Sequence, residues 1–449
     1  MKSKTAICSL IGVLLVAFFM VGCKKEDNTV DDKIGTAKDF LYLTPEYQPG
    51  SYRNIDRIFN TRIFKCGTTV FPLPKSSKAL TSVKYSPDGI NNYDIDDFIS
   101  RNNVAGLLII KNGEIVLEKY ALGNNETSKW TSFSVAKSVT STLIGIAIQD
   151  GIIKSINDPM TDYLPQMKGT AYEGVTIRQL LQMSSGVDWN EDYRYPLSSF
   201  TSMYEAIADG TEGGIIEVMS NLTRSEIPGK KFLYSSGESY LEGKVLKAAL
   251  GNESLSGFLS RKIWANMGME SDGYWLLESQ DGDEFGGGNL SMTLRDYGRF
   301  GLFIQNNGMV NGISVLPPYW VAEASHPASD SPQCNYGELY SSFNNYPYPY
   351  YYPLGYGYNW WPMPETAWGG WDYLNDPDWW GTDAIQPSAA NFTNLEGSFT
   401  AQGVFGQFIH INQKEKVVSI IWSAWKDPWI DPKEYEAYSF INAATGLLH

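Results

Sequence analysis

The stretch SVAKSVTSTLIGIAIQDGII, residues 134–153, decides how this chain is interpreted. A serine and a lysine three residues apart on a helix lie on one face, so the side chains of Ser134 and Lys137 are within reach of each other. A serine hydroxyl is a poor nucleophile until a neighbouring base takes its proton, and a desolvated lysine amine is such a base. The stretch therefore predicts a serine acyl-transfer site that needs no histidine. The alternative is a solvated helix start in which Ser134 is only the N-cap residue.

A second S-x-x-K pattern, at Ser423 and Lys426, lacks this geometry. It follows the β-branched run KVVSIIW, residues 416–422, which is typical of a strand. Residues three apart on a strand point to opposite faces, so these two side chains cannot meet. Only the first copy is a candidate site.

The N-terminal segment predicts export and lipid attachment. Residues 1–22 have two lysines followed by an apolar run, which is typical of a signal peptide. They end in Met20-Val21-Gly22 before Cys23, a pattern that resembles a bacterial lipobox with Cys23 as the lipidated residue. Residues 23–50 are then the lipidated cysteine and a flexible linker. We expect an exported bacterial lipoprotein, facing the periplasm or lying at the cell surface, whose only membrane contact is its lipid anchor. An uncleaved anchor helix is the alternative.

Composition argues against two classes of protein. The net charge of −15 over 449 residues argues against a nucleic-acid partner, because such binding depends on lysine and arginine. The chain contains no C-x-x-C or H-E-x-x-H pattern, so the sequence gives little support for a zinc site. Cys66 and Cys334 either pair in an oxidising compartment or, as their wide separation favours, are buried separately.

Strands are predicted near both ends of the chain, and helices between them. Residues 104–110 and 114–120 flank Lys111-Asn112-Gly113 and predict a hairpin on an Asn-Gly turn. Residues 399–412 and 416–425 predict a second strand pair around Gln413-Lys414-Glu415. Helices are predicted over residues 135–149, 176–183, 236–250, 254–267 and 293–306. This order predicts an α+β fold with one antiparallel sheet formed from N- and C-terminal strands, flanked by helices, and an inserted, mostly helical region.

The predicted domain spans residues 51–449. Its α/β part covers about 51–130 and 285–449, and its helical part about 131–284. Residues 336–380 form an insertion dense in proline, glycine, tyrosine and tryptophan. Stacked aromatic side chains can bind sugar rings, but a long surface loop that packs on itself is the favoured interpretation. A lid over a site would be consistent with both interpretations.

Blocks of sequence downstream of Ser134 carry a family resemblance. They are INDPMTDYLPQM (156–167), VTIRQLLQMSSGVDW (175–189), IPGKKFLYSSGESY (227–240), GGGNLSMTLRDYGRFG (286–301) and AQGVFGQ (401–407). In this order they resemble the serine β-lactamase and penicillin-binding-protein superfamily. The resemblance is strongest to its class C-like branch, which includes esterases, D-amino-acid peptidases and 6-aminohexanoate-dimer hydrolases. It runs from about residue 51 to residue 445 and implies a β-lactamase/transpeptidase-like fold.

The resemblance implies a role for several residues. Ser134 would be the acylated nucleophile and Lys137 its proton acceptor. Tyr234, in the motif Tyr234-Ser235-Ser236, would be the second acid/base group, and Ser236 would contact the substrate. A free lysine titrates near 10.4 and a tyrosine near 10, so both groups need a perturbing environment to share a proton with a serine. Without the flanking PGKKF and SGESY, an aromatic side chain half-buried beside a turn would be the favoured interpretation of Tyr234.

The third motif departs from the family pattern. Better-known members carry Lys-Thr-Gly or His-x-Gly on a strand, where this chain has Ala401-Gln402-Gly403. The missing basic residue puts β-lactamase and D,D-peptidase activity in doubt and favours a less charged ester or amide substrate. The resemblance implies that the backbone N–H groups of Ser134 and Val404 form the oxyanion hole, with Gly403 against the substrate. Taken alone, the glycines indicate only a bend in a strand.

Residues 189–200, WNEDYRYPLSSF, resemble the loop that closes over substrate in the 6-aminohexanoate-dimer hydrolases. Asp192 and Tyr193 are candidate substrate contacts there, although a solvated loop is the favoured account of each. A Ser-His-Asp triad has little support, because His410 lies within a strand pattern and His449 is the last residue. No G-x-S-x-G motif occurs, and no pair of carboxylates stands out as a glycosidase site.

The sequence therefore predicts a serine hydrolase that cleaves an ester or amide through an acyl-enzyme on Ser134. No metal or organic cofactor is implied, and the expected partner is a small-molecule ester or amide. Two alternatives remain. One is a non-catalytic surface lipoprotein that binds a glycan or peptide, and the other is a penicillin-recognising D,D-peptidase. Oligomeric state is left open.

Overall fold

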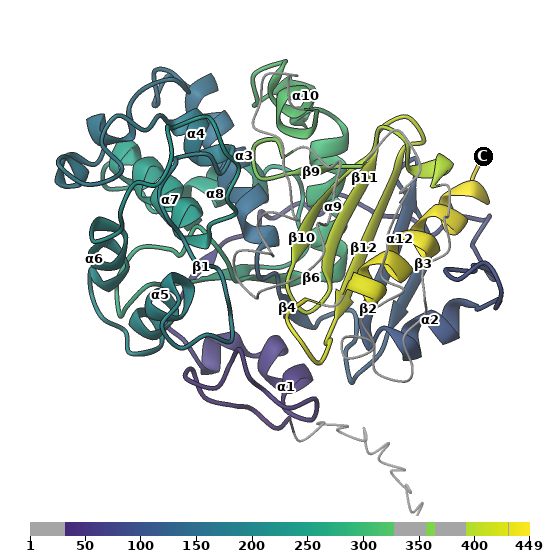
Figure 1. Ribbon diagram of the computed structural model, residues 1–449. Coiled ribbons are helices and arrows are strands. Elements are labelled where there is room, and N and C mark those ends of the chain that lie inside the picture. Colours follow the sequence, from purple (N-terminus) through teal and green to yellow (C-terminus); the bar gives the residue numbers. More distant parts are fainter. Residues whose placement is uncertain (1–31, 327–355, 364–391, 430) are drawn as a thin grey trace, which may run out of the picture. The chain divides into compact units, whose positions relative to one another are not determined.

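The computed structural model describes residues 32–326, 356–363, 392–429 and 431–449 (Figure 1). The signal segment, Cys23 and Cys334 lie outside these ranges, so the predictions about export, lipidation and cysteine pairing stay predictions. The predicted flexible linker is wrong for residues 32–50, because Phe40, Leu41 and Leu43 are buried in the main core. Within the described ranges, no helix combines the length and apolar character needed to cross a membrane. Cys66 is half-buried and has no disulfide partner there.

The main sheet joins the two ends of the chain, as predicted. β2 (Val104–Lys111) and β3 (Glu114–Tyr120) form the first hairpin. Its turn residues Asn112 and Gly113 both have positive φ, the geometry that an Asn-Gly turn supplies. β12 (Val417–Ser423) pairs antiparallel with β2 and connects the C-terminal strands to this hairpin. The strand order is β3-β2-β12-β11-β10-β9.

The C-terminal strands differ in one detail from the prediction. Residues 399–412 are two strands rather than one, β10 (Phe399–Gly403) and β11 (Gln407–Asn412). A three-residue turn separates them, in which Phe405 and Gly406 have φ of 62° and 86°. β9 (Trp361–Pro362) adds a short edge strand beside β10.

Side chains alternate between the two covered faces of this sheet. Leu108, Ile110 and Ile420 pack in a core with α9 (Leu294–Gln305) and α3 (Val135–Gln149). Leu107, Ile109 and Ile421 pack in a second core with α2 (Ile95–Arg101) and α12 (Asp431–Gly446). Figure 1 shows α12 crossing the sheet. The sequence did not predict α12 as a separate element.

A second, smaller sheet was not predicted. Its strand order is β1-β5-β6-β4, and all its neighbours are antiparallel. The strands are β1 (Thr61–Phe64), β5 (Gly273–Leu276), β6 (Leu290–Thr293) and β4 (Lys129–Thr131). Because β4 ends three residues before Ser134, this sheet fixes the entry of the chain into α3.

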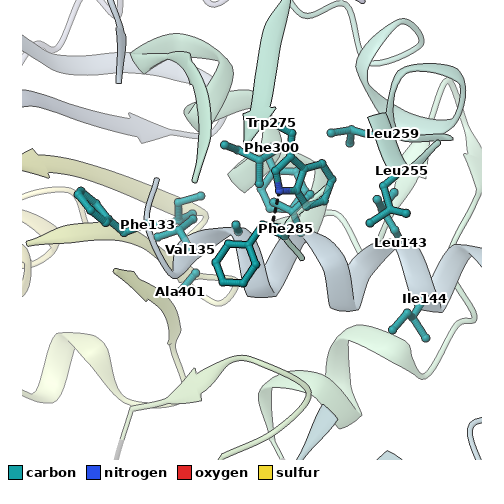
Figure 2. Close-up of a cluster of buried hydrophobic side chains, with 14 of the residues drawn as sticks. Phe133, Val135, Leu143, Ile144, Leu255, Leu259, Trp275, Phe285, Phe300 and Ala401 are labelled. Atoms are coloured by element: carbon teal, nitrogen blue, oxygen red, sulfur yellow. Dashed lines mark hydrogen bonds between the residues drawn. The ribbon is translucent and has the colours of Figure 1, made fainter. Parts of the chain in front are cut away.

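α3 has the bounds that the sequence predicted, and its residues from Val135 to Ala147 are buried. Figure 2 shows Val135 and Ala401 near one end of the helix and Leu143 and Leu255 further along it. A helix buried along most of its length is held by packing on several sides, which fixes the direction of the side chains at its start.

The other helices lie mostly between the two hairpins of the main sheet. α7 (Ser236–Leu250) has its predicted bounds. Residues 254–267, predicted as one helix, instead contain α8 (Leu255–Leu259) followed by a π-helical turn, Ser260–Trp264. The remaining elements are α1 (Gln48–Arg53), α4 (Ile177–Leu181), α5 (Ser199–Ala208), α6 (Gly214–Ser220), α10 (Trp320–Ser325) and the hairpin β7 (Met309–Val310) with β8 (Ile313–Ser314).

Only residues 356–363 of the predicted aromatic insertion are described, and they do not form a surface loop. Ser138 Oγ donates to Asn359 O at 2.6 Å, and Asn359 Nδ2 donates to Lys137 O at 3.2 Å. Tyr356, Asn359 and Trp361 are buried against α3 and its surroundings. This piece is therefore part of the core behind Ser134. The rest of the insertion lies outside the described residues.

Candidate active site

Ser134 begins α3 with its hydroxyl turned toward Lys137. Lys137 Nζ lies 2.9 Å from Ser134 Oγ. Ser134 occupies the N-cap position but makes no side-chain capping bond, so capping does not account for its hydroxyl. Phe133 before it has φ of 44°, an uncommon conformation for a residue with a side chain. Its ring is held by Tyr52 and Phe405, which keeps this tight turn in place.

Lys137 is buried among neutral partners, with 2% of its side chain exposed. Besides Ser134, its Nζ contacts Ser236 Oγ at 3.0 Å and Gly287 O at 2.7 Å. Burial lowers the pKa of Lys137 to about 8, although the charges of Glu191 and Glu242 act in the opposite direction. A neutral amine has two N–H donors and one lone pair. These match Ser236, Gly287 and the hydroxyl of Ser134.

Tyr234 lies on the other side of the lysine. Its ring centroid is 5.1 Å from Lys137 Nζ, and the ring stacks on Trp361. Burial raises the pKa of Tyr234 well above its usual range, the charge of Glu191 adds to this, and a hydrogen bond with Ser134 acts against it. The phenol is therefore protonated at neutral pH and is a donor beside the Ser134 oxygen.

Ser236, the first residue of α7, links the lysine to a carboxylate. Its Oγ lies 2.5 Å from Glu191 Oε1, and its backbone N–H donates to Glu191 Oε2 at 2.9 Å. Glu191 also accepts from Trp189 Nε1 at 2.5 Å and from the Tyr193 hydroxyl at 3.2 Å. Burial raises the pKa of Glu191, while Lys137 and the hydrogen bonds from Ser236 and Trp189 lower it. The site thus contains a continuous hydrogen-bonded series from Ser134 through Lys137 and Ser236 to Glu191.

Sequence reasoning selected Asp192 and Tyr193, the two residues after Glu191, and missed Glu191 itself. The structure places Tyr193 at the cavity beside Ser134, whereas Asp192 is not among the residues that line it. The Asp192 carboxylate instead accepts from the backbone N–H of Arg194 at 2.8 Å and closes a local turn. The available signal was Trp189 two residues before Glu191, since a tryptophan N–H needs an acceptor when it is buried.

The strand end that was predicted to complete the site lies against Ser134. A Cβ added to Gly403 would lie 2.5 Å from Ser132 O and 3.2 Å from Ser134 N, so only glycine fits there without movement. The amides of Ser134 and Val404 have no hydrogen-bond acceptor among the described residues. Two unpaired amides beside a nucleophile are suited to hold an oxyanion.

The third motif contributes no basic group. Ala401 is buried, and Gln402 Nε2 donates to Glu434 Oε1 at 3.0 Å, on the side of α12 rather than toward Ser134. Gln402 therefore cannot replace the missing lysine or histidine.

Two further buried acids, also missed from the sequence, lie one turn apart on α7. Asn359 Nδ2 donates to Glu242 Oε2 at 2.6 Å, and the Ser185 hydroxyl donates to Glu238. Burial raises the pKa of Glu238 to about 8 and that of Glu242 well above its usual value. The Glu238 carboxyl is therefore mostly protonated at neutral pH, the pKa of Glu242 is shifted in the same direction, and both side chains support the site from behind.

Comparison with known proteins gives concordant matches. Residues 96–440 match the family model described as Beta-lactamase. The 6-aminohexanoate-dimer hydrolase of Paenarthrobacter ureafaciens is 24% identical over 340 residues, which cover 75% of this chain and 76% of that protein. The structure titled "Putative 6-aminohexanoate-dimer hydrolase from Bacillus anthracis" matches with a TM-score of 0.74 at 21% identity, over 92% of this chain and 97% of that one. A penicillin-binding protein homologue from Pyrococcus abyssi matches with a TM-score of 0.53 at 18% identity, over 79% and 76%.

Proposed function

The chain belongs to the beta-lactamase family, and we propose that it is a serine hydrolase that cleaves an ester or amide through an acyl-enzyme on Ser134. The solved neighbours confirm the predicted α+β fold of the β-lactamase/transpeptidase type. The observation that carries the proposal is the 2.9 Å contact between Ser134 Oγ and a buried lysine whose other two partners are neutral. Such a lysine keeps a substantial neutral fraction near pH 8 and is able to act as a base.

In the proposed acylation, Ser134 Oγ attacks the carbonyl carbon of the substrate and its proton passes to the neutral Lys137 amine. The amides of Ser134 and Val404 hold the resulting oxyanion. As the bond to the leaving group breaks, Tyr234 donates its proton to that group and recovers one from Lys137. Water then attacks the acyl-enzyme and gives up a proton to the same pair. The carboxylic acid leaves, and Ser134 recovers its hydrogen.

The third motif supports an ester or amide substrate over a penicillin-like one. Recognition of a carboxylate on the substrate needs a basic partner. This chain has Ala401 at that position, and the side chain of Gln402 is bound to Glu434 of α12. The proposal therefore favours esterase or amidase activity.

A fluorophosphonate probe tests the proposal directly on the purified protein. We expect a covalent adduct on Ser134 that is lost in Ser134→Ala. Ser423→Ala is the matched control, because it removes the serine of the second S-x-x-K pattern, whose hydroxyl is buried and has no partner among the described residues. Absence of labelling in the wild type would support the non-catalytic binder, and stable labelling of Ser134 by fluorescent penicillin would support the peptidase.

A further inference from the structure

A cavity of about 450 Å³, including the solvent at its mouth, opens beside Ser134. Ser134, Ser236 and Val404 form the part of its wall that belongs to the catalytic centre. The rest is mainly apolar and comes from the N-terminal segment, from α5, and from β5 with the loop after it. The main apolar contributors are Phe40, Leu41, Phe200, Met203, Leu276 and Phe285.

The cavity offers no counter-charge to a charged group, and its polar side chains are Ser134, Ser236, Asn289 and two tyrosines. All its lining residues are described, and none is Asp, Glu, Lys, Arg or His. Two of them carry phenol groups, and both hydroxyls already donate to the protein. Tyr204 donates to Ala37 O at 2.8 Å, and Tyr193 donates to Glu191 at 3.2 Å. A charge placed here would lose its hydration without gaining a counter-charge, which is strongly unfavourable.

The arrangement also indicates which half of a substrate enters the cavity. In the proposed reaction Tyr234 protonates the leaving group, so the leaving group must lie on the side of Tyr234. That tyrosine does not line the cavity but packs against Trp361 and Tyr356. The cavity therefore lies on the acyl side of Ser134.

We propose that this cavity is the acyl-binding site and that the substrates carry an uncharged, apolar acyl group, such as a linear aliphatic chain or a single aromatic ring. This inference rests on the proposed function and specifies its substrate class. Phe40 and Leu41 precede the part of the chain that matches the family, residues 96–440. Their segment is held in place where the Tyr42 hydroxyl donates to Tyr193 O at 2.6 Å. Part of the acyl selectivity is thus set by residues outside the family match.

The first test uses the wild-type protein and five p-nitrophenyl esters, which share one leaving group. We expect kcat/KM for the hexanoate ester to exceed that for the 6-aminohexanoate ester and for the adipate half-ester by about 100-fold or more, because only these two bring a charge into the cavity. Within the series acetate, butanoate, hexanoate, each added methylene is expected to raise kcat/KM by about fourfold until the cavity is full. Equal rates for hexanoate and 6-aminohexanoate would overturn the inference.

A pair of variants locates the selectivity in the cavity. Leu41→Glu places a carboxylate in its wall and is expected to raise the ratio of 6-aminohexanoate to hexanoate cleavage by at least about tenfold. Leu43→Glu is the matched control, since Leu43 belongs to the same segment, is 8% exposed against 6% for Leu41, and does not line the cavity. An equal change in both variants would contradict the assignment. If either glutamate variant fails to fold, Leu41→Ala and Leu43→Ala replace them, and only the first is expected to weaken the preference for hexanoate over acetate.

Fluorophosphonate labelling distinguishes failure of the acyl-site inference from failure of the proposed function. Labelling of Ser134 together with no discrimination against charged acyl groups would reject the acyl-site inference and leave the proposed function standing. No labelling of Ser134 in the wild type would reject the proposed function and this inference with it.

Discussion

Lys137 determines the pH range in which the proposed site works. A general base must be unprotonated, so its pKa sets the lower limb of the pH–rate profile. Burial brings the pKa of Lys137 to about 8, and the negative charge of Glu191 opposes this effect. The lysine is thus balanced between desolvation, which favours the amine, and a nearby carboxylate, which favours the ammonium.

The first prediction concerns this balance. With an uncharged ester, kcat/KM should rise with pH and level off above about pH 8. Glu191→Gln removes the charge that raises the pKa of Lys137, so the limb should move to lower pH. Asp192→Asn is the control, because the Asp192 carboxylate binds the backbone N–H of Arg194 instead and should leave the limb in place. A limb that moves to higher pH in Glu191→Gln would contradict the assignment of Lys137 as the base.

The second prediction concerns Gly403. Alanine there brings a Cβ to 2.5 Å from Ser132 O, a backbone atom that cannot move away without shifting Ser134. We expect Gly403→Ala to lower the rate of fluorophosphonate labelling by at least about tenfold and to cost about 1–3 kcal/mol of stability. Gly298→Ala on α9 is a control for overpacking, since its Cβ would meet Ile110 Cδ1 at 2.7 Å, away from the site. Because its neighbours there are the ends of flexible side chains and the position is inside a helix, Gly298→Ala should cost less stability than Gly403→Ala, and it should have little effect on labelling.

Among the individual residues of the candidate site, the sequence predicted some and not others. The S-x-x-K spacing on one helix brought Ser134 and Lys137 together, and the motif at Tyr234 and Ser236 located two more. Glu191 was missed because its role depends on contact with α7, far along the chain, and loop residues have no periodicity to show which way they point. Their catalytic roles stay predictions until the labelling experiment is done.

Among the elements, the segment 356–363 has an unexpected position behind α3. Asn359 connects it to the backbone of Lys137 and to the buried Glu242. Trp361, two residues later, stacks on Tyr234. This short segment therefore supports both the helix that follows Ser134, the proposed nucleophile, and the ring of the proposed acid.

The third prediction tests this support. Asn359→Ala removes the donor to Glu242 and the bond to Lys137 O, so we expect a loss of about 1–3 kcal/mol in urea unfolding together with slower labelling of Ser134. Tyr356→Phe is the matched variant, because the Tyr356 hydroxyl donates to Asn359 Oδ1 at 3.0 Å and its loss leaves the other two bonds intact. Equal losses in the two variants would show that the anchoring role belongs to the segment's packing instead.

Elements with a clear period were predicted well, and elements without one were missed. The strands of the first hairpin and the bounds of α3 and α7 agree with the prediction. α12 was missed because Glu434, Glu436 and Ser439 are buried along it, which interrupts the apolar stripe that marks a helix. The small sheet was missed because strands of three or four residues are too short to show alternation.

For the whole molecule, the buried acids of α7 affect stability as well as the site. The pKa of Glu238 is raised from 4.5 to about 8 in the folded protein, and burial shifts that of Glu242 in the same direction. Between pH 4.5 and 8 the folded protein therefore holds a proton on Glu238 that the unfolded chain does not. Stability must fall as pH rises through this window.

The fourth prediction is a thermal profile that follows from this sign. We expect the unfolding temperature to decrease between pH 5 and pH 8, because the free energy of unfolding falls by up to about 1.4 kcal/mol per pH unit for each such group. Glu238→Gln should flatten the profile because its side chain does not titrate. Lys137 has the opposite effect on stability, and at higher pH. Between about pH 8 and 10.5 the lysine is neutral in the folded protein but still protonated in the unfolded chain, so stability rises there. Calorimetry across this range in both proteins measures the difference, and identical profiles would contradict it.

The architecture of the molecule was predicted because its sheet is built from strands at both ends of the chain, each with a recognisable hairpin pattern. Which strands become neighbours was not encoded locally. Val417 pairs with Lys111, and nothing near either residue specifies the other. The surroundings of Ser134 likewise depend on segments from α1 to β10, so packing rather than local pattern completes them.

The pairing of β2 with β12 has a consequence for biosynthesis. A ribosome makes α3 long before it makes β10 and β12, so the emerging polypeptide presents an open, apolar strand edge at β2 until β12 has been made. The wall that Gly403 forms beside Ser134 does not exist until then. Products that stop before β12 should thus lack this wall beside Ser134 and be prone to aggregate.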